Sequence, residues 1–353
     1  MTPPEDPASL SSTSHAPAAG GLAGVPSSGV PADRMRVTRG GIWQLWTGRA
    51  RNVYVVYAAV AAFFLVGRFA NHAYGTSAFY VNAVTLGLFV VVAGFGQTTT
   101  MLAGGFDLSI PGVITLTGIL LMGFTGLSGS GAIWAIPLVL LVGAAVGLGN
   151  GVGIVALKIN PIVMTLATNT ILGGVVLAYT QGTPVGSVPS VIKGLTQGTV
   201  AGIPNTLLLF VAFGVAGVII LNFTSFGRRL YAVGSSPRAA TLAGVSVPQV
   251  TIFAYMLSGL AAAFAGILLS GYANSAFLGM GEPYLMLSLA AAVVGGISVR
   301  GGRGYFAGTT GAALILMIVT GVLASTTLPE AVRDIVLGGI IISVVVIARQ
   351  DVG

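Results

Sequence analysis

The chain has 353 residues, of which 55% are hydrophobic and only 7% are charged, and its mean hydropathy is +0.96. Because a soluble domain carries roughly a quarter charged residues, this composition excludes a soluble protein and indicates a polytopic membrane protein. The sequence contains no cysteine, which excludes disulfides and thiolate metal sites, and most residues behind the net charge of +7 lie in predicted loops.

The first part of the chain is polar. Residues 1–33 are rich in Pro, Ser, Ala and Gly, and we expect them to form a disordered cytoplasmic tail. Residues 34–51 combine several arginines with Trp43 and Trp46, a composition that favours the cytoplasmic surface of a membrane. The expected transmembrane domain then covers residues 52–348.

Ten apolar segments are long enough to be predicted as membrane-spanning helices. They are 52–70, 80–103, 108–126, 132–157, 160–180, 204–222, 248–273, 284–299, 304–325 and 331–348. If the N-terminus is cytoplasmic, all but three of the 15 basic residues fall in cytoplasmic segments, the exceptions being Arg68, Lys193 and Arg333. This asymmetry predicts that both termini are cytoplasmic. Segment 284–299 is short enough to be a broken or re-entrant helix.

The segment between the second and third predicted spans contains the main ionisable residue near the membrane interior, Asp107. Gly104 and Gly105 permit a tight or broken backbone, and either Asp107 or Ser109 is suited to cap the helix that follows. We therefore predict a hinge and a helix cap. The alternatives for Asp107 are contact with a transported substrate and coupling to a partner.

Neutral polar residues inside predicted spans are candidates for a translocation pathway. Such side chains suit an uncharged polyol, which needs hydrogen-bonding partners, and the candidates are Gln97, Thr165, Thr168, Asn169 and Asn274. Helix packing is the alternative, because Ser, Thr and Asn also join membrane helices to one another. Farther along, the loop 181–203 is predicted to contain a small surface helix near Val191, and it serves either as a connector or as a docking surface for a partner.

A polar stretch, 226–247, contains the signature of a short helix over about 236–244. Ser236 is suited to the N-cap, Pro237 to the first helical position, and Gly244 to a left-handed C-terminal residue. Ala239, Leu242 and Ala243 share one face of this helix. Because so short a helix does not persist alone in water, this face is expected to contact either the protein's own membrane domain or another protein.

The sequence lacks the residues of several function classes. His15 and His72 lie far from each other outside the spans, no Gly-rich phosphate-binding loop is present, and no series of buried charges suggests a proton relay. We therefore predict no catalytic residue, no metal and no cofactor. A transporter of this kind must receive energy from a partner, and the stretch 226–247 is the best candidate for the receiving point.

Five motifs together resemble the permease subunit of bacterial ABC importers of the ribose/xylose/galactose type. They are Gly104-Gly-Phe-Asp-Leu-Ser109, Asn160-Pro-Ile-Val-Met-Thr-Leu166, Phe226-Gly-Arg-Arg-Leu-Tyr-Ala-Val-Gly234, Ala239-Ala-Thr-Leu-Ala-Gly-Val245 and Val294-Gly-Gly-Ile-Ser-Val-Arg-Gly-Gly-Arg-Gly304. The resemblance covers residues 50–348 and implies an all-α, type II importer-like fold. It also implies two cytoplasmic ATP-binding subunits, a periplasmic or lipid-anchored sugar-binding protein, and a second permease copy in a homodimer or heterodimer.

Within this resemblance, the helix 236–244 is similar to the coupling helix that contacts an ATPase subunit. The residues expected to form that contact are Ser236, Pro237, Arg238, Ala239, Ala240, Leu242 and Gly244. The expected function is import of a monosaccharide or related polyol across the inner membrane, with ATP hydrolysed by the partner subunits. The alternatives are a permease for branched-chain amino acids or another small polar solute, and an ATP-independent carrier.

Overall fold

The structure is a computed structural model that describes residues 53–62, 76–125, 132–183 and 188–324, together with short pieces between 329 and 339. The described residues belong to one compact unit, Trp46–Gly353. The predicted tail 1–33, the basic segment 34–51 and most of the predicted span 331–348 lie outside the described residues.

Long apolar helices dominate the described part of the chain, where six are long enough to cross a membrane. They are α2 (Ser77–Leu102), α4 (Ala132–Ala156), α5 (Pro161–Thr180), α7 (Asn205–Phe223), α10 (Val247–Ala273) and α12 (Phe306–Ala324). The described part of the chain therefore has an all-α, polytopic membrane fold, as the composition predicts.

Three apolar helices in the described residues are shorter: Val53–Ala62, α3 (Ile110–Thr125) and α11 (Pro283–Val294). All three lie within or overlap predicted spans, and residues 63–70, which complete the predicted span 52–70, lie outside the described residues. α11 has only 12 residues and ends at Val294, so segment 284–299 is a broken helix. α3 has 16 residues and coincides with the predicted span 108–126 to within two residues at its start, and residues 126–131 lie outside the described part of the chain.

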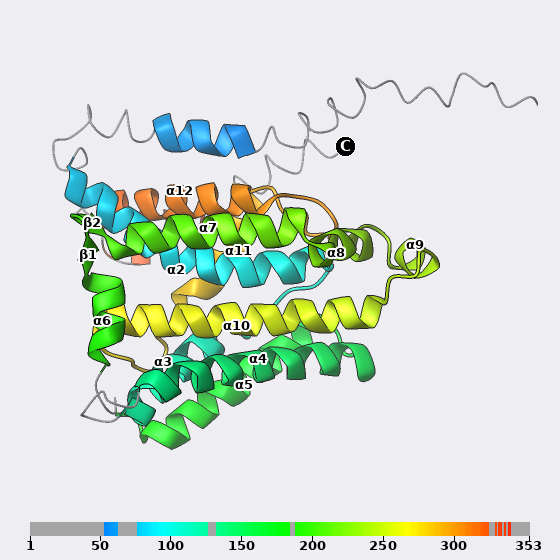
Figure 1. Ribbon diagram of the computed structural model, residues 1–353, viewed down its shortest axis with the longest axis horizontal. Helices are drawn as coiled ribbons and strands as arrows, with labels where there is room; N and C mark the ends of the chain where they lie inside the picture. The colour runs from blue at the N-terminus through cyan, green and yellow to red at the C-terminus, as the bar shows by residue number, and fades with distance from the viewer. Residues whose placement is uncertain are drawn as a thin grey trace, which may run out of the picture. The chain divides into compact units, whose positions relative to one another are not determined.

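Helices α2 and α10 form the centre of the bundle. They run side by side, α7 and α12 pack against α2, and α4 packs against α10, with α5 beyond it (Figure 1). α2 is buried almost continuously from Gly87 to Leu102, because neighbours surround it. A helix that is apolar on every side is expected in such a position.

Glycines allow α4 and α10 to pack closely. Gly143, Gly147 and Gly151 recur every four residues on α4 and therefore share one face. A Cβ atom at Gly147 would lie 2.2 Å from the carbonyl oxygen of Tyr255, and one at Gly151 would lie 2.7 Å from the Cα of Ile252. The backbones of the two helices are thus in direct contact, as in other membrane helix pairs with small residues at this spacing.

The two ends of the bundle carry different short elements (Figure 1). At one end, here called the α6 end, lie α6 (Ser190–Gln197) and the antiparallel strands β1 (Thr199–Val200) and β2 (Ile203–Pro204). α6 confirms the small surface helix predicted in the loop 181–203. At the opposite end, here called the α9 end, lie α8 (Ser225–Ser235) and α9 (Pro237–Leu242).

Candidate functional site

Asp107 occupies the break between α2 and α3 and is buried, with 1% of its surface exposed. One carboxylate oxygen, Oδ1, accepts hydrogen bonds from the backbone N–H and the hydroxyl of Ser109, at 2.9 and 2.5 Å. The other, Oδ2, accepts a hydrogen bond of 2.6 Å from the Ser258 hydroxyl. Ser258 lies near the middle of α10, so Asp107 fastens the broken segment to the centre of the bundle.

This polar cluster extends into α4 and α5. The Asn150 side-chain amide donates a hydrogen bond of 2.8 Å to the Ser109 hydroxyl, and the Thr168 hydroxyl donates one of 2.6 Å to the Asn150 carbonyl oxygen. A chain of hydrogen bonds therefore joins α10, the α2–α3 segment, α4 and α5. We call Asp107, Ser109, Asn150, Thr168 and Ser258 the Asp107 network.

Two members of the Asp107 network, Asn150 and Ser258, are missing from the residues predicted for the site. Both are small polar residues in Gly- and Ala-rich helices, where the sequence offers no periodic signal that separates a network member from a packing residue. The one available signal is that Asn150 is flanked by Gly149 and Gly151, which leaves room for close helix contact.

Thr165 and Asn169 also bind the beginning of α3. Thr165 Oγ1 accepts a hydrogen bond of 3.0 Å from the Leu108 N–H, and Asn169 Oδ1 accepts one of 2.8 Å from the Gly112 N–H. The first backbone N–H groups of a helix have no partner inside it, so these side chains satisfy donors that would otherwise be orphaned. Two of the predicted pathway residues, Thr165 and Asn169, thus have hydrogen bonds that hold the beginning of α3 against α5, whereas Thr168 joins α5 to Asn150 of α4.

Gln97 has a different environment. It lies on α2 with 1% of its surface exposed, and neither its amide nitrogen nor its amide oxygen has a hydrogen-bond partner among the described residues. Burying an amide without partners costs about 1–3 kcal/mol on protein scales, so such a group calls for a specific explanation. Asn274, in contrast, is exposed at the α6 end and ends α10 with a left-handed backbone conformation, φ 55°.

The predicted short helix is present as α9, and its two ends follow from local sequence. The Ser236 hydroxyl accepts a hydrogen bond of 3.3 Å from the Ala239 N–H, and Pro237 begins the helix. Gly244 has φ +78°, which allows the Val245 N–H to bind the Ala240 carbonyl at 2.9 Å. This is the C-terminal arrangement that a left-handed glycine favours.

One face of α9 contacts no other described residue closely. Leu242 is 86% exposed, and Ala239, Ala243 and Arg238 are also exposed. Ala240 alone turns inward and is 3% exposed, so it anchors α9 to its own chain and offers no surface to a partner. Leu242, Ala239 and Ala243 together form a small exposed apolar face, which makes α9 a candidate docking surface.

α8 connects α9 to the core of the bundle. The Tyr231 hydroxyl donates a hydrogen bond of 2.7 Å to the Gly304 carbonyl, and the Ser235 hydroxyl donates one of 3.2 Å to the Gly302 carbonyl. Burial raises the pKa of the Tyr231 phenol, so it remains a neutral donor. The Gly302 N–H in turn binds the Leu102 carbonyl at 3.0 Å. Hydrogen bonds to the segment 302–304 therefore connect α8 to the end of α2, just before the segment that holds Asp107.

Basic residues gather at the α9 end in the described part of the chain. Those that lie in the connections there are Lys158, Arg228, Arg229, Arg238, Arg300 and Arg303, whereas Lys193 lies on α6 at the opposite end. The described residues include no group of three or more His, Asp or Glu side chains that could hold a metal ion.

Comparison with known proteins gives a consistent result. Residues 79–345 match the family described as "Branched-chain amino acid transport system / permease component". A ribose import permease protein of Bacillus subtilis (strain 168) is 34% identical over 258 residues, which cover 72% of this chain and 80% of that protein. An autoinducer 2 import system permease protein of Photorhabdus laumondii is 32% identical over 70% of this chain and 76% of its own length. An L-arabinose transport system permease protein of Escherichia coli (strain K12) is 30% identical over 93% and 97%. No solved structure matches the chain.

Proposed function

The chain belongs to the family of branched-chain amino acid transport system permease components, and we propose that it is the permease subunit of an ATP-driven importer for a monosaccharide or related polyol. The ribose and arabinose permeases among its relatives favour a sugar over an amino acid. The Asp107 network agrees with this choice: its carboxylate accepts hydrogen bonds from Ser109 and Ser258 and is not free to meet a zwitterion.

The observation that carries the proposal is the exposed face of α9. In a chain without its own ATP-binding loop, a capped helix that presents Leu242 to its surroundings is suited to fit a cytoplasmic ATP-binding subunit. The basic residues at the α9 end support a cytoplasmic position for this end, since cytoplasmic loops of membrane proteins are enriched in Lys and Arg. Both termini are then cytoplasmic, and α6 lies on the outer surface, where a sugar-binding protein docks.

The hydrogen bonds of α8 provide a route by which ATP hydrolysis in the partner subunits can move this chain. ATP-dependent closure of the partner subunits moves α9, and α8 transmits the movement through Tyr231 and Ser235 to the segment 295–304 and the end of α2. The segment with Asp107 follows directly, and α3 shifts with it. A second permease copy completes the importer.

Gln97 is the residue that we assign to the pathway. Its amide lies on α2, is buried, and lacks a partner in the described chain, so it is available to a hydroxyl group of a passing sugar. Asp107, Thr165 and Asn169 are assigned to holding α3, because their polar atoms are already bonded to that helix or to the segment before it. Thr168 is assigned to holding α5 against α4, because its hydroxyl is bonded to Asn150.

The substrate class is tested in cells from which the gene for this chain has been deleted and then restored. Uptake of radiolabelled ribose, arabinose, a set of hexoses and polyols, and leucine is measured. We expect restoration to recover uptake of one or more sugars or polyols and to leave leucine uptake unchanged. Recovery of leucine uptake alone would establish the amino-acid alternative.

Energy coupling is tested separately in proteoliposomes that contain the purified chain alone, supplied with ATP inside. We expect no concentrative uptake of the substrate identified in cells, and we expect it to appear when the ATP-binding subunits and the binding protein are added. Full concentrative uptake by the chain alone would show an ATP-independent carrier.

A further inference from the structure

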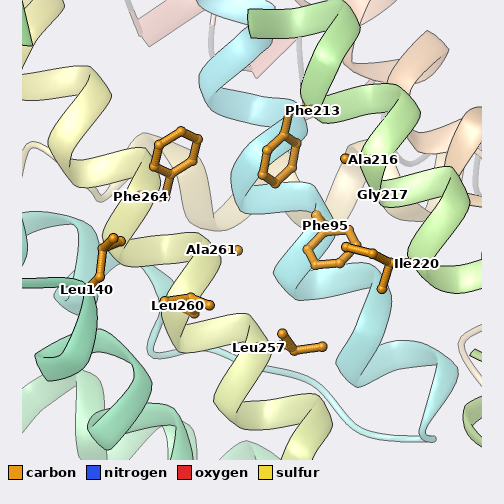
Figure 2. Close-up of a pocket in the computed structure, with 10 residues that line it drawn as sticks. All are labelled: Phe95, Leu140, Phe213, Ala216, Gly217, Ile220, Leu257, Leu260, Ala261 and Phe264. Atoms are coloured by element: carbon orange, nitrogen blue, oxygen red, sulfur yellow. The ribbon is translucent and has the colours of Figure 1, made fainter. Parts of the chain in front are cut away.

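A wholly apolar cavity of about 260 Å³ lies between α2, α4, α7 and α10. Figure 2 shows the side chains that face it from the four helices, among them Phe95, Leu140, Phe213, Ile220, Leu257 and Phe264. No lining residue carries a polar side chain. A transported sugar would lose its hydrogen bonds there, so the cavity is unsuited to the substrate proposed above and calls for an apolar occupant.

The cavity is elongated along the helices. Phe213 and Ile220 line it from α7, and their separation of seven positions corresponds to about 10 Å of helix. Phe213 and Phe264 stack at the end nearer α6, with ring centroids 5.9 Å apart, whereas Ile220 and Leu257 lie at the end nearer α8 (Figure 2). On the outer side Ala216 is exposed, so the cavity is a groove that opens on the surface of the bundle at membrane depth.

A fixed cation lies beyond the end of the groove nearer α8. The Arg228 guanidinium donates a hydrogen bond of 3.2 Å to the carbonyl of Phe223, which is three residues, or about 4.5 Å of helix, beyond Ile220. The rings of Phe226 and Phe253, 4.9 Å apart, pack α8 against the first turns of α10. Arg229 is exposed beside Arg228. Because guanidinium has five N–H donors and one is used by Phe223, Arg228 remains able to bind a phosphate.

An apolar groove at membrane depth and a basic residue at its surface end are together complementary to one kind of molecule. We propose that the groove binds one acyl chain of an anionic phospholipid whose phosphate is bound by Arg228. The stacked rings of Phe213 and Phe264 form the end of the acyl-chain site. The choice of an anionic headgroup agrees with the orientation proposed above, since anionic lipids are concentrated in the cytoplasmic leaflet.

The proposal is tested by photochemical labelling of the full-length chain in phosphatidylcholine nanodiscs. These contain a minor fraction of phosphatidylglycerol with a diazirine within one acyl chain, and a parallel sample carries the same label on phosphatidylcholine. After irradiation, mass spectrometry locates the adducts. We expect adducts from phosphatidylglycerol on peptides that contain residues 213–220 and 257–264.

Two variants separate the two parts of the site. Ala216→Phe fills the groove from its exposed side and should reduce adducts on both peptides to the level of other membrane-exposed peptides. Val215→Phe, its control, adds the same ring at an exposed neighbouring position that does not line the groove, and should leave the adducts unchanged.

Arg228→Ala should lower the preference for phosphatidylglycerol about fivefold, as expected for one basic residue at a membrane surface. Arg300→Ala removes an exposed charge from the same end and should not.

Three results would overturn the proposal. Groove adducts that persist in Ala216→Phe would show that the acyl chain lies elsewhere. Equal labelling by the two lipids, unaffected by Arg228→Ala, would show that Arg228 does not bind the lipid phosphate. Absence of groove adducts, with chemical cross-links from Ala216→Cys to another segment or a second copy, would show that protein covers the groove.

Discussion

The Ser258 hydroxyl donates a hydrogen bond of 2.6 Å to the Asp107 carboxylate across 151 positions of sequence. This contact joins the centre of α10 to the break between α2 and α3, at a depth where water is scarce. A buried carboxylate is tolerated there because hydroxyl and backbone donors surround it. The same arrangement gives the break a defined geometry, which a loop of two glycines and an unbonded acid would lack.

Substitution of Asp107 should distinguish hydrogen bonding from charge. In Asp107→Ala the Ser109 N–H and the two serine hydroxyls lose their acceptor, so we expect a loss of about 1–3 kcal/mol of stability. Asp107→Asn keeps Oδ1 as an acceptor, and its amide can donate to Ser258, so most of the stability should remain. Thermal unfolding of the full-length chain in detergent measures both. If Asn folds normally yet abolishes uptake as completely as Ala, the negative charge itself is required.

The contact between α4 and α10 should depend on Gly147. A Cβ there would lie 2.2 Å from the Tyr255 carbonyl oxygen, which belongs to a backbone that cannot move independently, so Gly147→Ala should lower the melting temperature by the equivalent of about 1–3 kcal/mol. Gly149→Ala is the matched control, because nothing lies within 4 Å of the added atom, and alanine favours a helix by up to ~1 kcal/mol. Equal effects of the two substitutions would refute the close backbone contact.

Local features of the structure follow from the sequence more closely than long-range ones. Ser236, Pro237 and Gly244 act within a few residues of one another, and both ends of α9 were predictable from them. The start of α3 at Ile110 likewise lies within two residues of the start predicted from hydropathy, because Asp107 and Ser109 directly precede its apolar run.

The Asp107 network shows most clearly which part of the site the sequence does not predict. Asp107 stands out as the acid nearest the predicted membrane interior, but its partners come from α4, α5 and α10. Which of many Ser, Thr and Asn residues face a common point depends on how the helices pack, and that is determined by backbone contacts such as the one at Gly147. The predicted pathway set therefore contained Thr165, Thr168 and Asn169, whose positions beside α3 only the tertiary structure specifies.

The assignment of Gln97 to the pathway predicts opposite effects on stability and transport. Gln97→Leu removes two buried polar atoms that have no described partner, so the melting temperature should stay the same or rise. Uptake per folded chain should fall, because the amide that we assign to the sugar is lost. Thr98→Val is the comparison: it removes a hydroxyl that pairs with Thr309 at 3.1 Å, so it should lower stability slightly and leave uptake intact. Normal uptake by Gln97→Leu would show that Gln97 does not contact the sugar in the pathway.

The exposed face of α9 is expected to couple ATP hydrolysis in the partner subunits to transport. Leu242→Asp places a charge where we expect an apolar contact with an ATP-binding subunit. Because Leu242 is 86% exposed, the chain should insert and melt as the wild type does. Burying an unpaired carboxylate in an apolar contact costs more than ~1.4 kcal/mol, so uptake should fall at least about tenfold. ATP hydrolysis by the subunits should persist but no longer drive transport.

The control for this variant is Gln249→Asp, which adds the same charge at an exposed position in the first turn of α10, at the same end of the bundle. It should transport normally, because it lies outside the face formed by Ala239, Leu242 and Ala243. Ala240 is unsuited to the test, since it is buried against its own chain and an acid there would disturb folding rather than docking. Wild-type uptake by Leu242→Asp would show that α9 is a connector. Equal losses in the two variants would attribute the effect to charge at this end of the bundle and not to contact through α9.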